Sequence, residues 1–89
     1  MPWLARIRSS KARDDVVRVA REYVAQLSAS ELELLPQECL TGVMTEAYIQ
    51  QCAWALARHH GHGDNARIVH KLGEFFSSAA VRLAELATP

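Results

Sequence analysis

One long apolar stripe in the last third of the sequence constrains the fold more than any other feature. Its members are spaced alternately three and four residues apart, with polar residues between them. This spacing brings all of them onto one face of an α-helix, and it predicts a helix from Asn65 to about Ala87 with Asp64 as its cap. The members of the stripe are Val69, Leu72, Phe76, Ala79, Leu83 and Leu86.

Two earlier segments show the same period. Lys11–Leu27 has one apolar and one charged face, and Ser9 or Ser10 is available to cap its first turn. The segment from Thr45, a suitable cap, to about His60 is apolar nearly all round, which is typical of a central helix. Gly61 supplies the stop that ends this helix. Both segments are therefore predicted to be long helices.

A short helix is expected between these two segments. Ser30 and Glu33 fit a capping box, and Pro36 disfavours helical geometry at the residue before it. Pro36–Met44 then reads as a loop with about one helical turn, because Gly42 weakens any longer helix. The elements together predict an all-α protein, a compact antiparallel helical bundle of three long helices plus one short helix.

The 89 residues are expected to form one domain. Residues 1–10 form a basic, partly apolar N-terminal arm that docks on a surface, and residues 11–89 form the helical bundle. No run of 18 apolar residues is present, so we expect no membrane span. The first residues lack the apolar stretch of a secretory signal, and two cysteines do not make a disulfide framework. We therefore expect a cytoplasmic protein.

Charge is unevenly distributed along the chain although the formal net charge is zero. Residues 1–21 carry a net charge of +4, residues 22–46 carry −5, and residues 47–89 carry +1. A basic head beside an acidic middle neutralises itself, either within one fold or between two copies. This distribution disfavours the large uniform field that steers nucleic acid.

A histidine cluster, His59, His60 and His62, is the most obvious candidate for chemistry. Imidazoles bind zinc, copper or nickel, and clustered histidines do so weakly in almost any fold. A structural site, however, needs about four converging ligands, and adjacent helical residues point about 100° apart. We expect no metal site here, and a weak metal-handling protein remains an alternative.

No pattern in the sequence indicates catalysis. Cys39 and Cys52 have no activating neighbours, and Ser77 and Ser78 lie in a helical pattern without the glycine turn of a nucleophile. No glycine-rich phosphate loop is present either. We expect neither an enzyme nor a bound cofactor.

Nucleic-acid binding is a second alternative, and it depends on the basic arm. Arg6, Arg8, Lys11 and Arg13 supply the positive charge that phosphate contact needs on one accessible face. Acidic residues interrupt that face, and the segment from Thr45 to His60 has no basic residue in its first turn, where a recognition helix would carry one. A nucleic-acid-binding regulator is therefore kept below a protein-binding role.

Trp54 is the strongest candidate for a partner contact. It shares a helix face with Gln51 and Arg58, opposite to the face that we assign to the core. Tryptophan and arginine are over-represented at interface hot spots. The alternative is that Trp54 packs against the N-terminal arm or the short helix within one chain.

The width of the apolar stripe suggests self-association. Phe75 and its apolar neighbours broaden the stripe, and the helix before it is apolar nearly all round, so one chain has too few residues to cover both. We expect a homodimer with Phe75, Ala79 and Leu83, or the Trp54 face, at the contact. The predicted function is a non-catalytic helical protein–protein interaction protein, an adaptor, assembly subunit or regulator, whose partner the sequence does not name.

Overall fold

All of the regular structure in the described part of the chain is helical. The computed structural model describes residues 2–40, 42–58 and 63–87, and no strand occurs within these ranges. The all-α class predicted from the sequence is therefore confirmed. The elements are α1 (Trp3–Arg8), α2 (Arg13–Ala25), α3 (Ala29–Glu33), the single 3-10 turn η1 (Gln37–Cys39), α4 (Glu46–Arg58) and α5 (Asn65–Ala87).

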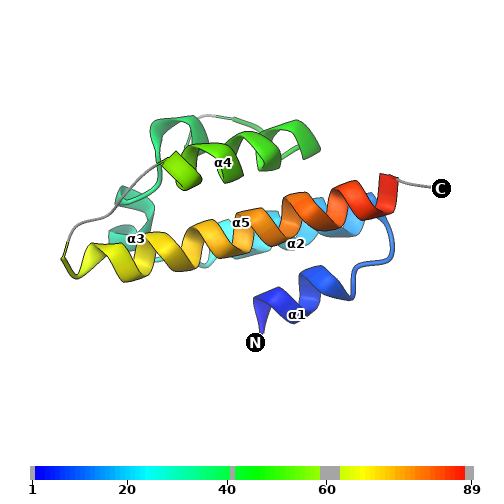
Figure 1. The fold of residues 1–89 in the computed structure, drawn as a ribbon, viewed down its shortest axis with the longest axis horizontal. Helices are drawn as coiled ribbons and strands as arrows, with labels where there is room; N and C mark the ends of the chain where they lie inside the picture. The colour runs from blue at the N-terminus through cyan, green and yellow to red at the C-terminus, as the bar shows by residue number, and fades with distance from the viewer. Residues whose placement is uncertain (1, 41, 59–62, 88–89) are drawn as a thin grey trace.

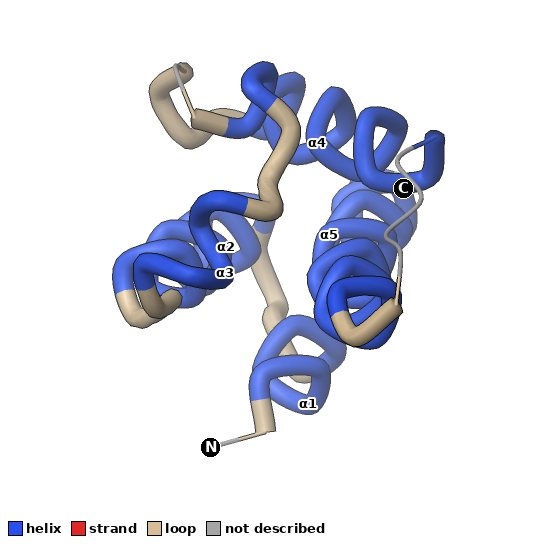
Figure 2. Tube along the Cα trace, turned by 90° about the vertical axis from the view of Figure 1, so that its left-hand side faces the viewer, coloured by secondary structure: helices blue, strands red, loops and turns tan. Residues whose placement is uncertain are grey.

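The long helix α5 forms the axis of the molecule. Helices α1, α2 and α4 all pack against it, and Figure 1 shows α4 running antiparallel to α5. Viewed from the end in Figure 2, α4, α2 and α1 surround one shared interior together with α5. The arrangement follows from the stripe, because Val69, Leu72, Phe76, Ala79 and Leu83 are all buried.

The N-terminal arm differs from its prediction, since its middle is a helix. In α1, Ile7 is completely buried, and the Ser10 hydroxyl donates a hydrogen bond of 2.9 Å to the Arg6 carbonyl oxygen. Arg82 of α5 donates two further bonds, of 2.9 and 2.6 Å, to the Ser10 carbonyl oxygen. Six residues are too few to show a helical period in the sequence, whereas packing against α5 stabilises them once the chain folds.

Helix α2 begins two residues later than predicted and ends two residues earlier. The prediction that Ser9 or Ser10 caps it was wrong, because both serines end α1 instead and Ala12 occupies the N-cap position. Asp14 and Asp15 in the first turn supply the negative charge that the amino end of a helix favours. Their carboxylates take over part of the role of a cap.

The cap of α3 lies two residues before its predicted position. Ser28 and Glu31 form the capping box, with the Glu31 amide donating to Ser28 Oγ at 3.2 Å and the Ser28 amide donating to Glu31 Oε1 at 2.9 Å. Ser30 followed by Glu33 shows the same pattern, so the sequence offers two registers. The structure uses the register that starts at Ser28.

Other boundaries agree with the predictions. Thr45 caps α4, because its hydroxyl oxygen accepts a hydrogen bond of 3.1 Å from the Tyr48 amide. The single turn expected after Pro36 is η1, and α5 has the predicted limits. Gly42 is required for a close approach, since a Cβ atom there would collide with the Tyr48 ring. The stop at Gly61 lies outside the described residues.

Candidate functional site

The outer face of α4 is exposed, as its sequence pattern predicts. Ile49, Cys52, Ala53 and Leu56 are buried in the core, while the residues on the opposite side face solvent. The side chain of Trp54 is 63% exposed, so the alternative that it packs within one chain is wrong. The exposed residues of this face include Ala47, Gln50, Gln51, Trp54, Ala57 and Arg58.

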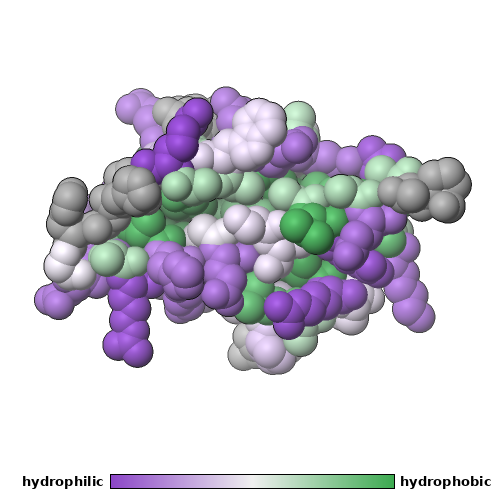
Figure 3. Space-filling view, viewed as in Figure 1, coloured by the Kyte–Doolittle hydropathy of each residue, from purple (hydrophilic) through white to green (hydrophobic). Residues whose placement is uncertain are grey.

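A shallow groove of about 390 Å³ runs beside this face, between α4 and α5. Most of its lining side chains are alanines, and such short side chains leave the backbones of the two helices close to the molecular surface. Figure 3 shows a band of apolar and neutral residues along the junction of α4 and α5, with hydrophilic side chains above and below it. We call the outer face of α4 together with this groove the α4–α5 surface. The groove is lined by Glu46, Ala47, Gln50, Ala80, Leu83, Ala84 and Ala87.

Three other predicted contact residues lie inside the chain. Phe75 and Ala79 are buried in the core, and Leu83 is buried where it forms the floor of the groove. Folding has covered the wide stripe of α5 with α1, α2 and α4, which is why these side chains hold the bundle together. Of the predicted contact residues, Gln51, Trp54 and Arg58 are the ones exposed to solvent.

The four basic residues that suggested nucleic-acid binding do not form one free positive face. Arg6 pairs with Glu22 at 2.8 Å, and its guanidinium lies 4.9 Å from the centre of the Trp3 ring. Arg8 and Lys11 are exposed. The acidic middle of the sequence thus neutralises part of the basic head within one fold.

Arg13 is held most firmly of the four. Its Nε and Nη2 atoms donate hydrogen bonds of 2.9 and 2.6 Å to Glu46 Oε1, which ties the start of α2 to the start of α4. The hydrogen bond and charge of the Glu46 carboxylate raise the pKa of Arg13 above its ordinary value. This guanidinium would have to leave Glu46 before it could contact a phosphate in the same way.

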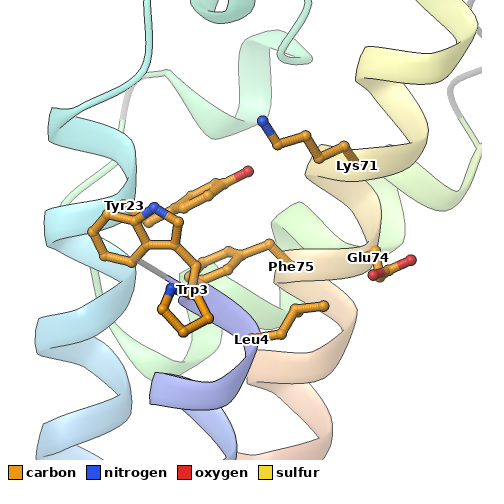
Figure 4. A pocket seen from close by; sticks show the side chains of 7 residues that line it. Trp3, Leu4, Tyr23, Lys71, Glu74 and Phe75 are labelled. Atoms are coloured by element: carbon orange, nitrogen blue, oxygen red, sulfur yellow. The ribbon is translucent and has the colours of Figure 1, made fainter.

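A second concave site, which the sequence did not reveal, lies where α1 meets α2 and α5 (Figure 4). We call this hollow of about 460 Å³ the aromatic pocket. Trp3 meets the Tyr23 ring edge-on at 5.4 Å, and Tyr23 stacks on Phe75 with ring centres 3.7 Å apart. Only a weak indication of this pocket is present in the sequence, namely the apolar residues in the N-terminal arm. The pocket is lined by Pro2, Trp3, Leu4, Tyr23, Lys71, Glu74 and Phe75.

The chemistry of the aromatic pocket centres on Tyr23, whose side chain is 1% exposed. Its hydroxyl group has no hydrogen-bond partner among the described residues. Burial, together with the negative charge of Glu31, raises the pKa of Tyr23 to about 12. The phenol is therefore neutral at physiological pH and can donate a hydrogen bond.

The histidine cluster cannot be placed, since His59, His60 and His62 lie outside the described residues. Within the ranges that are described, no group of three or more histidine, cysteine, aspartate or glutamate side chains is arranged to hold a metal ion. None of the helices in these ranges combines the length and apolarity needed to cross a lipid bilayer.

The fold and its two surface sites define a small helical protein of the all-α class. The chain belongs to the family described as "Uncharacterized protein conserved in bacteria (DUF2252)", whose model matches residues 6–89. No curated protein and no solved structure matches the chain. The match includes the whole α4–α5 surface, and it includes the α2 and α5 walls of the aromatic pocket but not Pro2, Trp3 or Leu4.

Proposed function

We propose that this chain is a non-catalytic interaction module that forms a homodimer through the α4–α5 surface. The observation that carries the proposal is the exposed Trp54 ring beside a groove lined mainly by alanines. An exposed tryptophan has a large apolar area to bury and few rotamers to lose. Small side chains next to it allow the backbone of a second helix to approach closely.

A second copy of α4 suits this surface because Arg58 at the end of the helix can join Arg13 at the Glu46 carboxylate of the partner, whose second face stays open to solvent. Glu46 lies at its start and Arg58 at its end, about 18 Å apart at the ordinary rise of an α-helix. A two-fold axis near Gln51 and Trp54 sets two α4 helices antiparallel, which brings each Arg58 toward the partner's first turn. Within the described part of the chain Arg58 has no ion-pair partner of its own.

The description of the bacterial family names no activity, so membership of it neither supports nor opposes this role. A nucleic-acid-binding role is less well supported than dimerisation, because Arg6 and Arg13 are both engaged by glutamates. The acidic partners would have to be displaced before those two side chains met phosphate. We place the module in the cytoplasm, as the sequence led us to expect.

Sedimentation velocity at micromolar concentration tests the proposal. The chain has a mass of 9.9 kDa, so the dimer should sediment with twice that mass. Trp54→Ala should shift the population to monomer, because it removes the largest exposed apolar side chain of the surface. Arg58→Glu should weaken the dimer, and the effect should be greatest at low salt, where charge interactions are least screened.

A matched control is Val43→Ser, which removes another exposed apolar side chain that does not line the groove. This variant should remain dimeric. A wild-type mass near 9.9 kDa would contradict the homodimer. Equal dimerisation of Trp54→Ala and wild type would instead show that a different surface makes the contact.

A further inference from the structure

The aromatic pocket has the dimensions of a small-molecule site. Its volume of about 460 Å³ lies within the range of about 300–1,000 Å³ that such sites usually occupy. Its walls come from three separate helices, with Trp3 and Leu4 from α1, Tyr23 from α2 and Phe75 from α5. The pocket is distinct from the α4–α5 surface, since the two share no lining residue.

The Tyr23 hydroxyl is the polar atom that requires explanation. Most buried polar groups in proteins have a hydrogen-bond partner, because leaving one unsatisfied is costly. In residues 2–40, 42–58 and 63–87 this hydroxyl has none, although its side chain is almost completely buried. Figure 4 shows the hydroxyl end of Tyr23 pointing toward the Lys71 side chain across the pocket. The hydroxyl is shielded from water, so a ligand must displace the side chains around it, and its acceptor atom then meets two donors, the hydroxyl and Lys71.

Lys71 is available for such a contact. Its Nζ atom lies 3.8 Å from Glu31 Oε2, and the side chain is largely exposed, so this ion pair is weak. The other oxygen of that carboxylate, Glu31 Oε1, already accepts the Ser28 amide in the capping box. Glu74 also borders the pocket, but in Figure 4 its side chain points away from Tyr23, and its carboxylate lies 3.6 Å from His70.

From this arrangement we propose that the aromatic pocket binds a small aromatic carboxylate. The ring of the ligand lies against Trp3 and Leu4, where apolar and aromatic surface is available. One carboxylate oxygen accepts a hydrogen bond from the Tyr23 hydroxyl, and the Lys71 ammonium neutralises the charge. The raised pKa of Tyr23 supports this role, because a phenol that stays protonated remains a donor over the physiological range.

Two-dimensional ¹H–¹⁵N NMR of the full chain tests the proposal, with benzoate and 1-naphthoate as probes and benzylamine as the cationic counterpart of benzoate. The carboxylates should bind saturably, with dissociation constants below about 1 mM, and should shift the Trp3 indole signal. Benzylamine should bind more weakly, since it offers no acceptor to Tyr23 or Lys71.

Tyr23→Phe is the sharpest variant because it removes only the hydroxyl group. It should weaken carboxylate binding roughly tenfold or more, the usual effect of losing a hydrogen bond to a charged group. The melting temperature without ligand should stay level or rise, since the variant also removes an unsatisfied buried group. Lys71→Met should weaken the carboxylates and strengthen benzylamine, because it removes a positive charge that repels this cation.

Two controls separate this site from the rest of the molecule. Lys11→Met removes a lysine that does not line the pocket and should leave carboxylate binding unchanged. Trp54→Ala should also leave it unchanged, so failure of the dimer proposal would not affect this test. The proposal is overturned if no probe saturates, if benzylamine binds as well as benzoate, if Tyr23→Phe binds normally, or if Tyr23→Phe lowers the melting temperature.

Discussion

The two tryptophans lie in opposite kinds of surroundings. Trp3, on a helix of only six residues, contacts Tyr23 edge-on and carries the Arg6 guanidinium on its face. Trp54, on a helix of thirteen residues, is 63% exposed and makes no ring contact within the described part of the chain. The short helix is held by the Trp3–Tyr23 contact, by the buried Ile7 and by the bonds from Arg82, whereas the longer one is fixed by its buried face and leaves Trp54 exposed.

This difference separates residues that hold the fold together from residues that are available for binding. Around the aromatic pocket, substitutions that remove a ring should destabilise the protein, because Tyr23, Phe75 and Phe76 form one connected cluster of rings. On the α4–α5 surface, substitutions should change association and leave the stability of the folded chain nearly unaltered.

The largest effect is expected for Phe75→Ala. The substitution removes the ring that stacks on Tyr23 at 3.7 Å and leaves a cavity between α2 and α5. The free energy of unfolding should fall by about 3–5 kcal/mol, as measured by urea denaturation followed by circular dichroism. Phe75→Leu should cost clearly less. An equal loss for both variants would show that ring stacking contributes little.

Next comes Ile7→Ala, which tests whether α1 is part of the fold or a loosely attached arm. Ile7 is completely buried, so its truncation should lower the free energy of unfolding by about 2–4 kcal/mol. Leu40→Ala is the control, because Leu40 is half exposed and should change stability by less than about 0.5 kcal/mol. If Ile7→Ala behaves like the control, α1 is not docked in solution.

Alkaline pH should also destabilise the protein. Burial raises the pKa of Tyr23 to about 12, and burial together with the charge of Cys52 raises that of Tyr48 to about 12, from an ordinary value of 10.0. As the pH rises, the unfolded chain therefore loses these protons before the folded chain does. The contribution of the two tyrosines to the free energy of unfolding is fully present below pH 10 and is lost as the pH rises to 12. Ionisation of each tyrosine contributes to this loss.

Urea midpoints measured across this pH range check the prediction, and absorbance near the phenolate band follows the ionisation itself. Tyr23→Phe should remove the part of the alkaline fall in stability that comes from Tyr23, and Tyr48→Phe should remove the part that comes from Tyr48. A tyrosine that titrates near its ordinary value in the folded protein would show that its ring is open to water.

The smallest effect on folding is expected for Trp54→Ala. Because the ring is largely exposed, the free energy of unfolding of the monomer should change by no more than about 0.5 kcal/mol. Denaturation at protein concentrations low enough to dissociate the dimer measures the free energy of unfolding of the monomer alone. A loss above about 2 kcal/mol would mean that Trp54 is buried in the monomer.

The long helices were predictable because their signals repeat. The α5 stripe extends over five turns, and the cap at Thr45 fixes the start of α4, so both boundaries could be read from local rules. The exposed face of α4 followed from the same period. Tertiary packing did not need to be known to place Trp54 opposite Ile49 and Leu56.

Other features depend on contacts between residues distant in the sequence, and local patterns do not report them. Helix α1 is too short to have a visible period, and it forms where Ile7 is buried beneath α5. The aromatic pocket needs Trp3, Tyr23 and Lys71, which only the tertiary fold brings together. The α3 cap had two equivalent sequence registers, and nothing local distinguished Ser28 from Ser30.

The two hydrogen bonds from Arg82 to the Ser10 carbonyl oxygen have a consequence for the order in which the protein is assembled during translation. The donor and the acceptor are 72 positions apart, so α1 leaves the ribosome long before the residue that anchors its end has been made. At roughly 5–20 residues per second, that delay lasts several seconds. Until Arg82 emerges, α1 has α2 to pack against but not the end of α5, so it reaches its final place late.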